Sequence, residues 1–370
     1  MIYLDNAATT FPKPDCVIDA ITDFLKNCGG NPSRGGHYLS ALSGEKVFLC
    51  REELASLIGV DTPEQIVFTK NTTEALNLAI KGILSRGDEV IISSMEHNSV
   101  LRTCVDLEKE GIILKIARAD SSGIVNPDEV LSMITNRTKL ICMIHISNVT
   151  GSVNPVREIC SIARKNGVLM LLDAAQSGGV LDIDTSCGDM IAFAGHKALY
   201  GPMGTGALYV RKGITLDTLT EGGTGSFSES ALMPDSFPER FEAGTLNACG
   251  IAGLYEGIKF VKREGVKEKE HELGKFLIEQ MSAVRRAKII GSPSVGVVGL
   301  SLSGHDCVDV ATRLDREHNI ASRAGLHCSP MAHRTLGTIT SGLLRFSTGF
   351  FNTKEEITAT AYALQKVLEN

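Results

Sequence analysis

The amino-acid sequence predicts an α/β protein with a large domain built on a mainly parallel sheet and a smaller α+β domain at the C-terminus. Short apolar runs alternate with helical segments from about residue 15 to about residue 210, which is typical of consecutive βαβ units. A segment rich in glycine and serine interrupts this alternation at residues 221–228. The 370 residues are enough for two domains, one of them with a full core.

The elements of the large domain follow from apolar runs and helical periodicity. Each predicted strand is short and almost continuously apolar, so we expect a sheet that helices cover on both faces. The predicted strands cover residues 66–68, 89–92, 112–116, 140–144, 168–172 and 189–193. The predicted helices between them cover residues 74–84, 99–110, 128–135 and 156–166.

The C-terminal part of the chain has a different pattern. A charged helical face at 262–270 precedes strands near 295–302 and 343–347. A final helix is predicted at about 353–368, where Thr353 and Glu356 have the spacing of a capping box. We expect the large domain to span residues 15–254, and the small domain to combine residues 255–370 with the first 14 residues.

Composition excludes several classes of protein. Hydrophobic residues make up 43% and charged residues 22%, and the net charge of −6 with no basic stripe argues against nucleic acid as a partner. The apolar runs are too short to span a membrane, and the N-terminus does not look like a signal peptide, so we expect a cytoplasmic protein. None of the ten cysteines forms a C-x-x-C motif, so we expect no metal and a reducing compartment.

A lysine and an aspartate follow two consecutive predicted strands. Asp173 and Gln176 come after the strand at 168–172, and His196 and Lys197 come after the strand at 189–193. Ligands of parallel sheets bind beyond the carboxyl ends of the strands, so we expect these side chains near one crevice. Enzymes that use pyridoxal 5'-phosphate (PLP) need a lysine for the Schiff base and an acid for the ring nitrogen. Alone, each residue would favour a surface lysine or a capping aspartate, but the pair favours a PLP site.

The segment Asn71-Thr72-Thr73-Glu74 runs from a predicted strand into a helix. The free N–H groups of a helix N-terminus suit a phosphate, and the hydroxyl groups of Thr72 and Thr73 could add donors. An ordinary cap by Asn71 and Glu74 is the alternative, and on this segment alone it is favoured. A PLP lysine in the same sheet makes the phosphate interpretation the better one.

Two further polar residues follow strands of the same sheet. His97 lies beyond the strand at 89–92, where it could stack on a cofactor ring and relay a proton. Asn148 lies beyond the strand at 140–144, where it could donate to the ring oxygen or to a substrate carboxylate. A capping histidine and a turn asparagine are the alternatives.

The small domain carries a candidate thiol and two candidate arginines. Cys328 follows His327 in a polar context, and Arg323 and His327 could favour its thiolate. The alternative is a small buried residue that happens to be cysteine. Arg345 interrupts an apolar strand, so we expect a partner, either a substrate carboxylate or a structural acid.

Taken in order, these segments resemble the class V aminotransferase family of PLP enzymes with fold type I, and within it the cysteine desulfurases. The resemblance covers nearly the whole chain. It rests on Tyr3-Leu-Asp-Asn-Ala-Ala8, Asn31-Pro-Ser-Arg-Gly-Gly-His37, Asn71-Thr72-Thr73-Glu74, Glu96-His97, Asn148-x-x-Gly151, Asp173-x-x-Gln176, Gly195-His196-Lys197 and Arg240-Phe-Glu-Ala-Gly-Thr245.

The thiol segment narrows the resemblance. Arg323-x-Gly325-x-His327-Cys328 is similar to the motif of the second, selenocysteine-lyase-like group of cysteine desulfurases. The resemblance implies that Cys328 carries a persulfide and that Arg345, with Arg323 nearby, binds the substrate carboxylate. It also implies that Lys197 and Cys328 are catalytic together with His97.

The cofactor site follows from the same resemblance. Family members are homodimers, so Gly223 and Thr245 would approach the cofactor of the neighbouring subunit. The family often has a serine or threonine where this chain has Ala194, which predicts weaker binding of PLP. The implied cofactor-binding residues are Thr72, Thr73, His97, Asn148, Asp173, Gln176, His196, Lys197, Gly223 and Thr245.

The resemblance implies conversion of L-cysteine, or of L-selenocysteine, to L-alanine, with transfer of the sulfur to an acceptor protein. A selenocysteine lyase or an aminotransferase on the same scaffold stays open, as does a binding protein that has lost the chemistry. A dinucleotide-binding oxidoreductase is disfavoured, because no G-x-G-x-x-G motif follows a first strand. Iron–sulfur cluster assembly is the expected use of the sulfur, with thiolation and selenium supply as alternatives.

Overall fold

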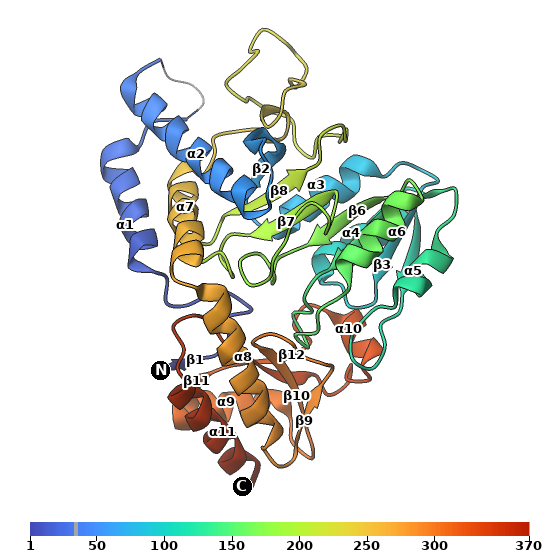
Figure 1. Ribbon diagram of the computed structural model, residues 1–370, viewed down its shortest axis with the longest axis vertical. Coiled ribbons are helices and arrows are strands. Elements are labelled where there is room, and N and C mark those ends of the chain that lie inside the picture. Colours follow the sequence, from blue (N-terminus) through green and yellow to red (C-terminus); the bar gives the residue numbers. More distant parts are fainter. Residues whose placement is uncertain (33–35, 370) are drawn as a thin grey trace.

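The computed structural model describes residues 1–32 and 36–369. Within these residues, a larger part is built on a seven-stranded sheet and a smaller part on a four-stranded sheet (Figure 1). Ser33, Arg34 and Gly35, in the middle of the motif that begins at Asn31, lie outside the described residues.

The larger sheet is mainly parallel, as predicted. From β7 to β4 all neighbouring strands are parallel, whereas β8 runs antiparallel to both β7 and β2. The predicted strands are all present with small shifts of their ends, but β8 was not predicted. In spatial order the strands are β2 (Ile66–Thr69), β8 (Gly206–Val210), β7 (Met190–Ala194), β6 (Leu169–Asp173), β5 (Thr138–Ile144), β3 (Glu89–Ser93) and β4 (Ile113–Ala117).

Helices cover both faces of this sheet, because successive apolar side chains of each strand point to opposite faces. Val90 and Leu140 pack toward α3 (Thr72–Ile83) and α4 (Asn98–Glu108). Ile91 and Ile141 pack on the other face. The helices there are α2 (Tyr38–Leu57), α5 (Pro127–Met133), α6 (Val156–Lys165) and α7 (Ala248–Arg263), and α1 (Asp15–Asp23) packs against α7.

The smaller part has an antiparallel sheet in the order β12 (Arg323–Gly325), β13 (Leu343–Ser347), β10 (Val297–Leu302) and β9 (Ala287–Ile290). Its apolar core includes side chains from α8 (Val266–Ser282), α9 (Cys307–His318) and α11 (Lys354–Glu369). The capping box predicted for α11 is confirmed: Thr353 and Glu356 exchange side-chain to backbone hydrogen bonds in both directions. The remaining short helices are α10 (Pro330–Thr335), η1 (Phe24–Cys28), η2 (Pro63–Gln65) and η3 (Glu239–Phe241).

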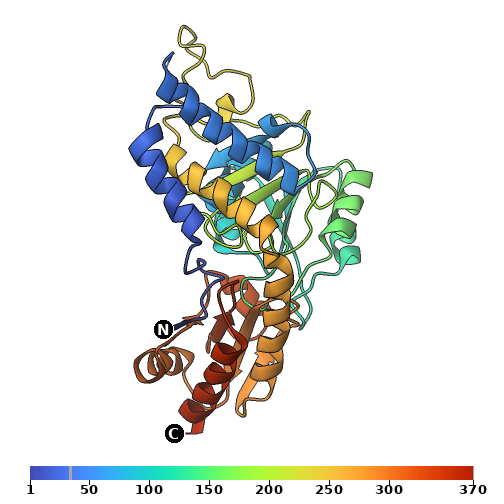
Figure 2. The same ribbon diagram turned by 60° about the vertical axis from the view of Figure 1, so that its left-hand side comes forward.

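The N-terminus lies against the smaller part (Figure 2). Strand β1 (Ile2–Tyr3) pairs in parallel with β11 (Ile320–Ala321), and Leu4 is fully buried in the core of the smaller part. Helices α7 and α8 follow one another and connect the two parts (Figure 2). Because α7 runs through the expected boundary after residue 254, the division into 15–254 and the remainder stays a prediction.

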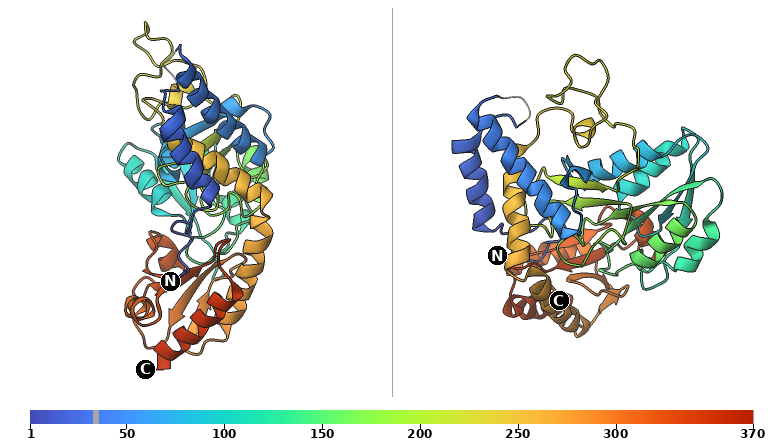
Figure 3. Two further views of the ribbon diagram at one scale, coloured as in Figure 1. Left: turned by 90° about the vertical axis from the view of Figure 1, so that its left-hand side faces the viewer. Right: turned by 45° about the horizontal axis from the view of Figure 1, so that its top comes forward.

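The glycine- and serine-rich segment at 221–228 forms neither a helix nor a strand, as expected. Together with the residues that follow it, the segment projects from the larger part as a long loop (Figure 3). No helix in the described part of the chain is both long and apolar enough to cross a membrane.

Candidate active site

The candidate site is a cavity of about 220 Å³, here called the inner cavity, at the carboxyl ends of the parallel strands. Turns after β3, β5, β6 and β7 and the N-terminus of α3 supply one wall, and the smaller part closes the other. Eleven predicted site residues line this cavity, namely Thr72, Thr73, His97, Asn148, Asp173, Gln176, His196, Lys197, Arg323, Cys328 and Arg345.

Lys197 and Asp173 lie on neighbouring walls of the inner cavity and influence each other's charge. Burial lowers the pKa of Lys197 to about 8, while the nearby carboxylate of Asp173 acts in the opposite direction. Asp173 is 4% exposed, and one of its oxygens accepts the N–H of Ala175 at 2.9 Å. Burial raises the pKa of Asp173. The site therefore combines an amine that loses its proton easily with a buried carboxyl group.

The N-terminal segment holds the backbone next to Lys197. The carbonyl oxygen of His196 accepts hydrogen bonds from Lys13 Nζ at 2.8 Å and from the backbone N–H of Thr10 at 3.2 Å. The hydroxyl of Thr10 also donates to the carbonyl of Lys197. These contacts fix the turn after β7, so the direction of the lysine depends on residues near the start of the chain.

The turn into α3 forms the end of the cavity that was expected to bind phosphate. Asn71 caps the helix: its side-chain oxygen accepts the N–H of Glu74 at 2.9 Å. The ordinary cap that was the alternative to a phosphate site therefore exists. Thr72 is 9% exposed and Thr73 is exposed, and both line the inner cavity. The cap uses the N–H of Glu74 and leaves the hydroxyl of Thr72 available for a ligand.

His97 is connected to this turn through Ser99. The Nδ1 atom of His97 accepts the backbone N–H of Ser99 at 3.1 Å, and the Ser99 hydroxyl lies 2.8 Å from Nδ1 and 2.7 Å from the Thr73 hydroxyl. Burial lowers the pKa of His97 to about 4. The neutral ring therefore carries its proton on Nε2, where it can act as a donor.

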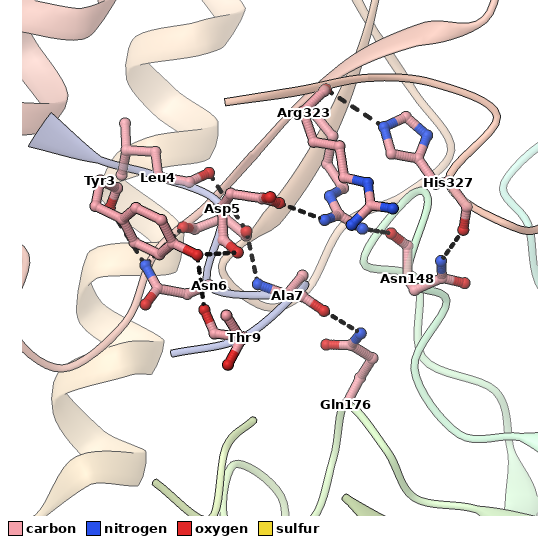
Figure 4. A network of polar contacts seen from close by, with 12 residues as sticks. Tyr3, Leu4, Asp5, Asn6, Ala7, Thr9, Asn148, Gln176, Arg323 and His327 are labelled. Carbon is pink, nitrogen blue, oxygen red and sulfur yellow. Dashed lines mark hydrogen bonds and ion pairs between the residues drawn. The ribbon is translucent and has the colours of Figure 1, made fainter. Parts of the chain in front are cut away.

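Gln176 and Asn148 already have protein partners. The amide nitrogen of Gln176 donates to the carbonyl of Ala7 at 2.9 Å, and that of Asn148 donates to the carbonyl of His327 at 2.8 Å (Figure 4). Gln176 thus connects the cavity wall to the N-terminal segment, and Asn148 connects it to the segment that carries Cys328.

Arg345 pairs with a structural acid, Asp5, which was one of the two partners expected from the sequence. Its guanidinium contacts Asp5 at 2.6 Å and donates to the carbonyl of Asn148 at 2.8 Å. Arg345 is 2% exposed, and its Nε atom has no hydrogen-bond partner among the described residues. Arg323 lines the cavity beside it, so two guanidinium groups face the same space from β12 and β13. A carboxylate bound here would meet concentrated positive charge.

Cys328 is exposed, whereas the other cysteines of the chain are buried or partly buried. Besides the inner cavity, it lines an open depression of about 610 Å³, here called the outer groove, together with Lys81, Arg102 and Asp106. The alternative of a buried, inert cysteine therefore does not describe this residue. Cys328 lies at the junction of the two spaces.

Gly223 and Thr245 do not line the inner cavity of their own chain. Thr245 borders a separate pocket with Thr69 and Lys70, and the carbonyl of Gly223 accepts the N–H of Gly244 at 2.9 Å. Their expected role toward a neighbouring subunit stays a prediction. Ala194 ends β7 and is 3% exposed, so it supplies no hydroxyl to the site.

The residues of the inner cavity fit PLP. The cavity brings together an amine of low pKa, a buried carboxyl group and the start of a helix. Two buried nitrogens beside it, His196 Nδ1 and Arg345 Nε, have no partner within residues 1–32 and 36–369. Such atoms are normally satisfied, so a polar ligand in the cavity would complete their hydrogen bonding. In the same residues no cluster of His, Cys, Asp or Glu could hold a metal ion.

Sequence reasoning assigned no role to Asp5 or Ser99, although both act on predicted site residues. Asp5 lies in the motif Tyr3-Leu-Asp-Asn-Ala-Ala8, and its position next to Arg345 follows from the pairing of the N-terminus with the smaller part. Ser99 comes two residues after His97, and the Nδ1 atom of His97 caps α4 by accepting the backbone N–H of Ser99. No local sequence pattern indicated this contact.

Comparisons with a family model and with individual proteins point to the same family of enzymes. The family model described as aminotransferase class V matches residues 2–360. A probable cysteine desulfurase of Methanothermobacter thermautotrophicus is 35% identical, with 99% of this chain and 94% of that protein covered. A probable cysteine desulfurase of Halalkalibacterium halodurans is 34% identical, with 100% and 93% covered.

A solved structure is similar over the whole chain. The apo structure of a cysteine desulfurase from Thermococcus onnurineus superposes with a TM-score of 0.91 at 32% sequence identity. The alignment covers 100% of this chain and 94% of that chain.

Proposed function

The chain belongs to the class V aminotransferase family, whose members depend on PLP, and we propose that it acts as a cysteine desulfurase. In this proposal L-cysteine is converted to L-alanine, and Cys328 takes up the sulfur as a persulfide. One observation carries the proposal: the exposed Cys328 shares the inner cavity with Lys197 and Asp173. An enzyme that exchanged amino groups would need the lysine and the aspartate but not the thiol.

The cofactor would be held by residues on three sides of the inner cavity. Lys197 would bind it covalently, Asp173 would hold the ring nitrogen protonated, and Gln176 would donate to the ring hydroxyl. His97 would lie against the ring face. Bound PLP supplies an electron-withdrawing ring that makes the Cα proton of the substrate acidic. The phosphate would be held by Thr72 and Thr73 at the start of α3 and by His196 in the turn after β7.

The substrate would be oriented by its carboxylate. Arg345 and Arg323 line the same cavity, and the unpartnered Nε of Arg345 is a free donor among the described residues. A bidentate contact with a guanidinium fixes both position and angle of a carboxylate. Asp5 keeps Arg345 in place through an ion pair at 2.6 Å.

Proton movement would be the task of Lys197 and His97. An amine with a pKa of about 8 is partly neutral near pH 7, so Lys197 can remove the Cα proton of the substrate and return it to the product carbon. His97, with its proton on Nε2, can donate to a neighbouring heteroatom without first being protonated from solvent.

Sulfur transfer would be the task of Cys328. Its thiolate attacks the sulfur of the bound cysteine, a sulfur–sulfur bond forms, and the carbon–sulfur bond breaks. The electron pair of that bond stays with the substrate carbon, which takes up a proton and leaves as alanine. Arg323 lines the same cavity and is one candidate for a cation beside this thiolate.

Three further features belong to the same proposal. The enzyme is a cytoplasmic homodimer in which Gly223 and Thr245 approach the cofactor of the neighbouring subunit. An acceptor protein collects the sulfur at the outer groove. Iron–sulfur cluster assembly is the process that this sulfur serves.

The test is the conversion of L-cysteine by PLP-loaded protein, with alanine and sulfide measured together in the presence of a reductant. The parent protein should release equal amounts of both, and Cys328→Ser should release neither while keeping the absorbance of bound PLP. Cys249→Ser, at a partly buried cysteine elsewhere, is the matched control. Desulfurase turnover by Cys328→Ser would refute the role of the thiol.

The rival activities are separated in the same assay. Amino-group exchange after addition of a keto acid would indicate an aminotransferase. Turnover of L-selenocysteine that is independent of Cys328, without turnover of L-cysteine, would indicate a selenocysteine lyase.

A further inference from the structure

Cys328 lies on a turn with a strained backbone. His327 and Cys328 have φ angles of +50° and +58°, in the left-handed region that residues other than glycine rarely occupy. One such residue costs free energy, and two in succession need support from the surrounding structure. The turn connects β12 to α10, and without support it would relax to an ordinary conformation.

Two hydrogen bonds hold the carbonyl groups of this turn. The carbonyl of Cys328 accepts the N–H of Asn98, at the start of α4, at 2.8 Å. The carbonyl of His327 accepts the side-chain amide of Asn148 at 2.8 Å (Figure 4). Both donors belong to the larger part of the protein, so the turn is fixed relative to Lys197.

Ser329 decides which way the Asn148 side chain faces. Its hydroxyl donates to the amide oxygen of Asn148 at 2.9 Å, and Ser329 is fully buried. Because an amide has an acceptor on one side and a donor on the other, this bond turns the nitrogen of Asn148 toward His327. The inner cavity includes Cys328 in its lining but not Ser329.

We propose that Ser329 is a positioning residue for Cys328, acting through Asn148. Its hydroxyl keeps the strained turn in the one conformation that exposes the thiol to both the inner cavity and the outer groove. This inference rests on the proposed function, in which Cys328 receives sulfur in the first space and delivers it in the second. A small displacement of a reacting atom lowers the rate of the step it takes part in.

The test compares Ser329→Ala with Ser329→Thr, which restores the hydroxyl. Ser43→Ala is the matched control, because Ser43 is also fully buried but its hydroxyl has no partner among the described residues. We expect Ser329→Ala to lower kcat for alanine release about fivefold, as the loss of one buried hydrogen bond would. KM for L-cysteine and the absorbance of bound PLP should stay at the parent's values. Ser329→Thr should recover most of the rate.

A second measurement does not depend on activity. Hydrogen exchange of the Asn98 amide, which donates to Cys328, should be faster in Ser329→Ala than in the parent and unchanged in Ser43→Ala. A parental kcat in Ser329→Ala, or an Asn98 amide that exchanges at the parent's rate, would overturn the inference. If the parent itself released no alanine, the proposed function would fail while the exchange experiment would still decide the role of Ser329.

Discussion

The carboxylate of Asp5 and the guanidinium of Arg345 form an ion pair at 2.6 Å between the N-terminal segment and strand β13. Arg345 is almost completely buried, and a buried charge without a partner is costly. The pair therefore joins the start of the chain to the smaller part and holds a cation beside the inner cavity.

Asp5→Asn should reduce the free energy of unfolding by roughly 2 kcal/mol, the size of a hydrogen bond to a charged group. Urea unfolding of parent and variant measures this difference. Asp235→Asn is the control, because Asp235 is fully exposed and forms an ion pair with Arg240. Equal effects of the two substitutions would contradict a special role for the buried pair.

Lys197 should bind PLP with a pH dependence set by its lowered pKa. The covalent attachment needs the neutral amine, and the neutral fraction rises with pH around a midpoint of about 8 instead of 10.5. When PLP is added to protein stripped of it, the attachment rate followed by absorbance should therefore level off above about pH 9. Lys197→Ala should give no covalent signal. A rate that keeps rising beyond pH 10 would contradict the lowered pKa.

The buried carboxyl group of Glu96 should make the free energy of unfolding depend on pH. Burial raises its pKa from 4.5 to about 8, and one of its oxygens, Oε2, has no partner within the described ranges. The other oxygen accepts the N–H of Ile144 at 2.8 Å. Between these two pKa values the carboxyl group stays protonated when folded but ionises when unfolded, so the parent loses stability as pH rises.

Glu96→Gln removes this titration. From about pH 5 to about pH 7, the stability of the variant relative to the parent should rise by about 1.4 kcal/mol per pH unit. Urea unfolding at several pH values measures how this stability difference changes with pH. Glu279→Gln, at an exposed glutamate, is the control for the effect of the Glu-to-Gln substitution itself. A difference that does not change with pH would show that Glu96 is ionised in the folded protein.

The sequence was sufficient to predict the parallel core and to group several candidate site residues at one edge of the sheet. The buried strands are short apolar runs, and the polar residues that follow them meet at one edge of the sheet because parallel strands end there. Lys197, Asp173, His97 and Asn148 could be grouped for that reason. Strand β8 was missed although it is an apolar run of similar length, and such a run does not reveal which way a strand runs.

The remaining contacts depend on long-range packing. Asp5 meets Arg345 only because β1 pairs with β11 in the smaller part. Similarly, the contact between Asn148 and the Cys328 turn joins residues of the larger and the smaller part. No local pattern contains such information, so these partners became visible only in the folded chain.

The central claim is that Cys328 accepts sulfur from a substrate bound beside Lys197. PLP-loaded protein is treated with one equivalent of L-cysteine per active site and no other thiol, thiols and persulfides are alkylated, and the cysteine-containing peptides are analysed by mass spectrometry. The account predicts one added sulfur atom on Cys328, accompanied by one alanine per active site. Alanine release with an unmodified Cys328, or with the added sulfur on another cysteine, would contradict it.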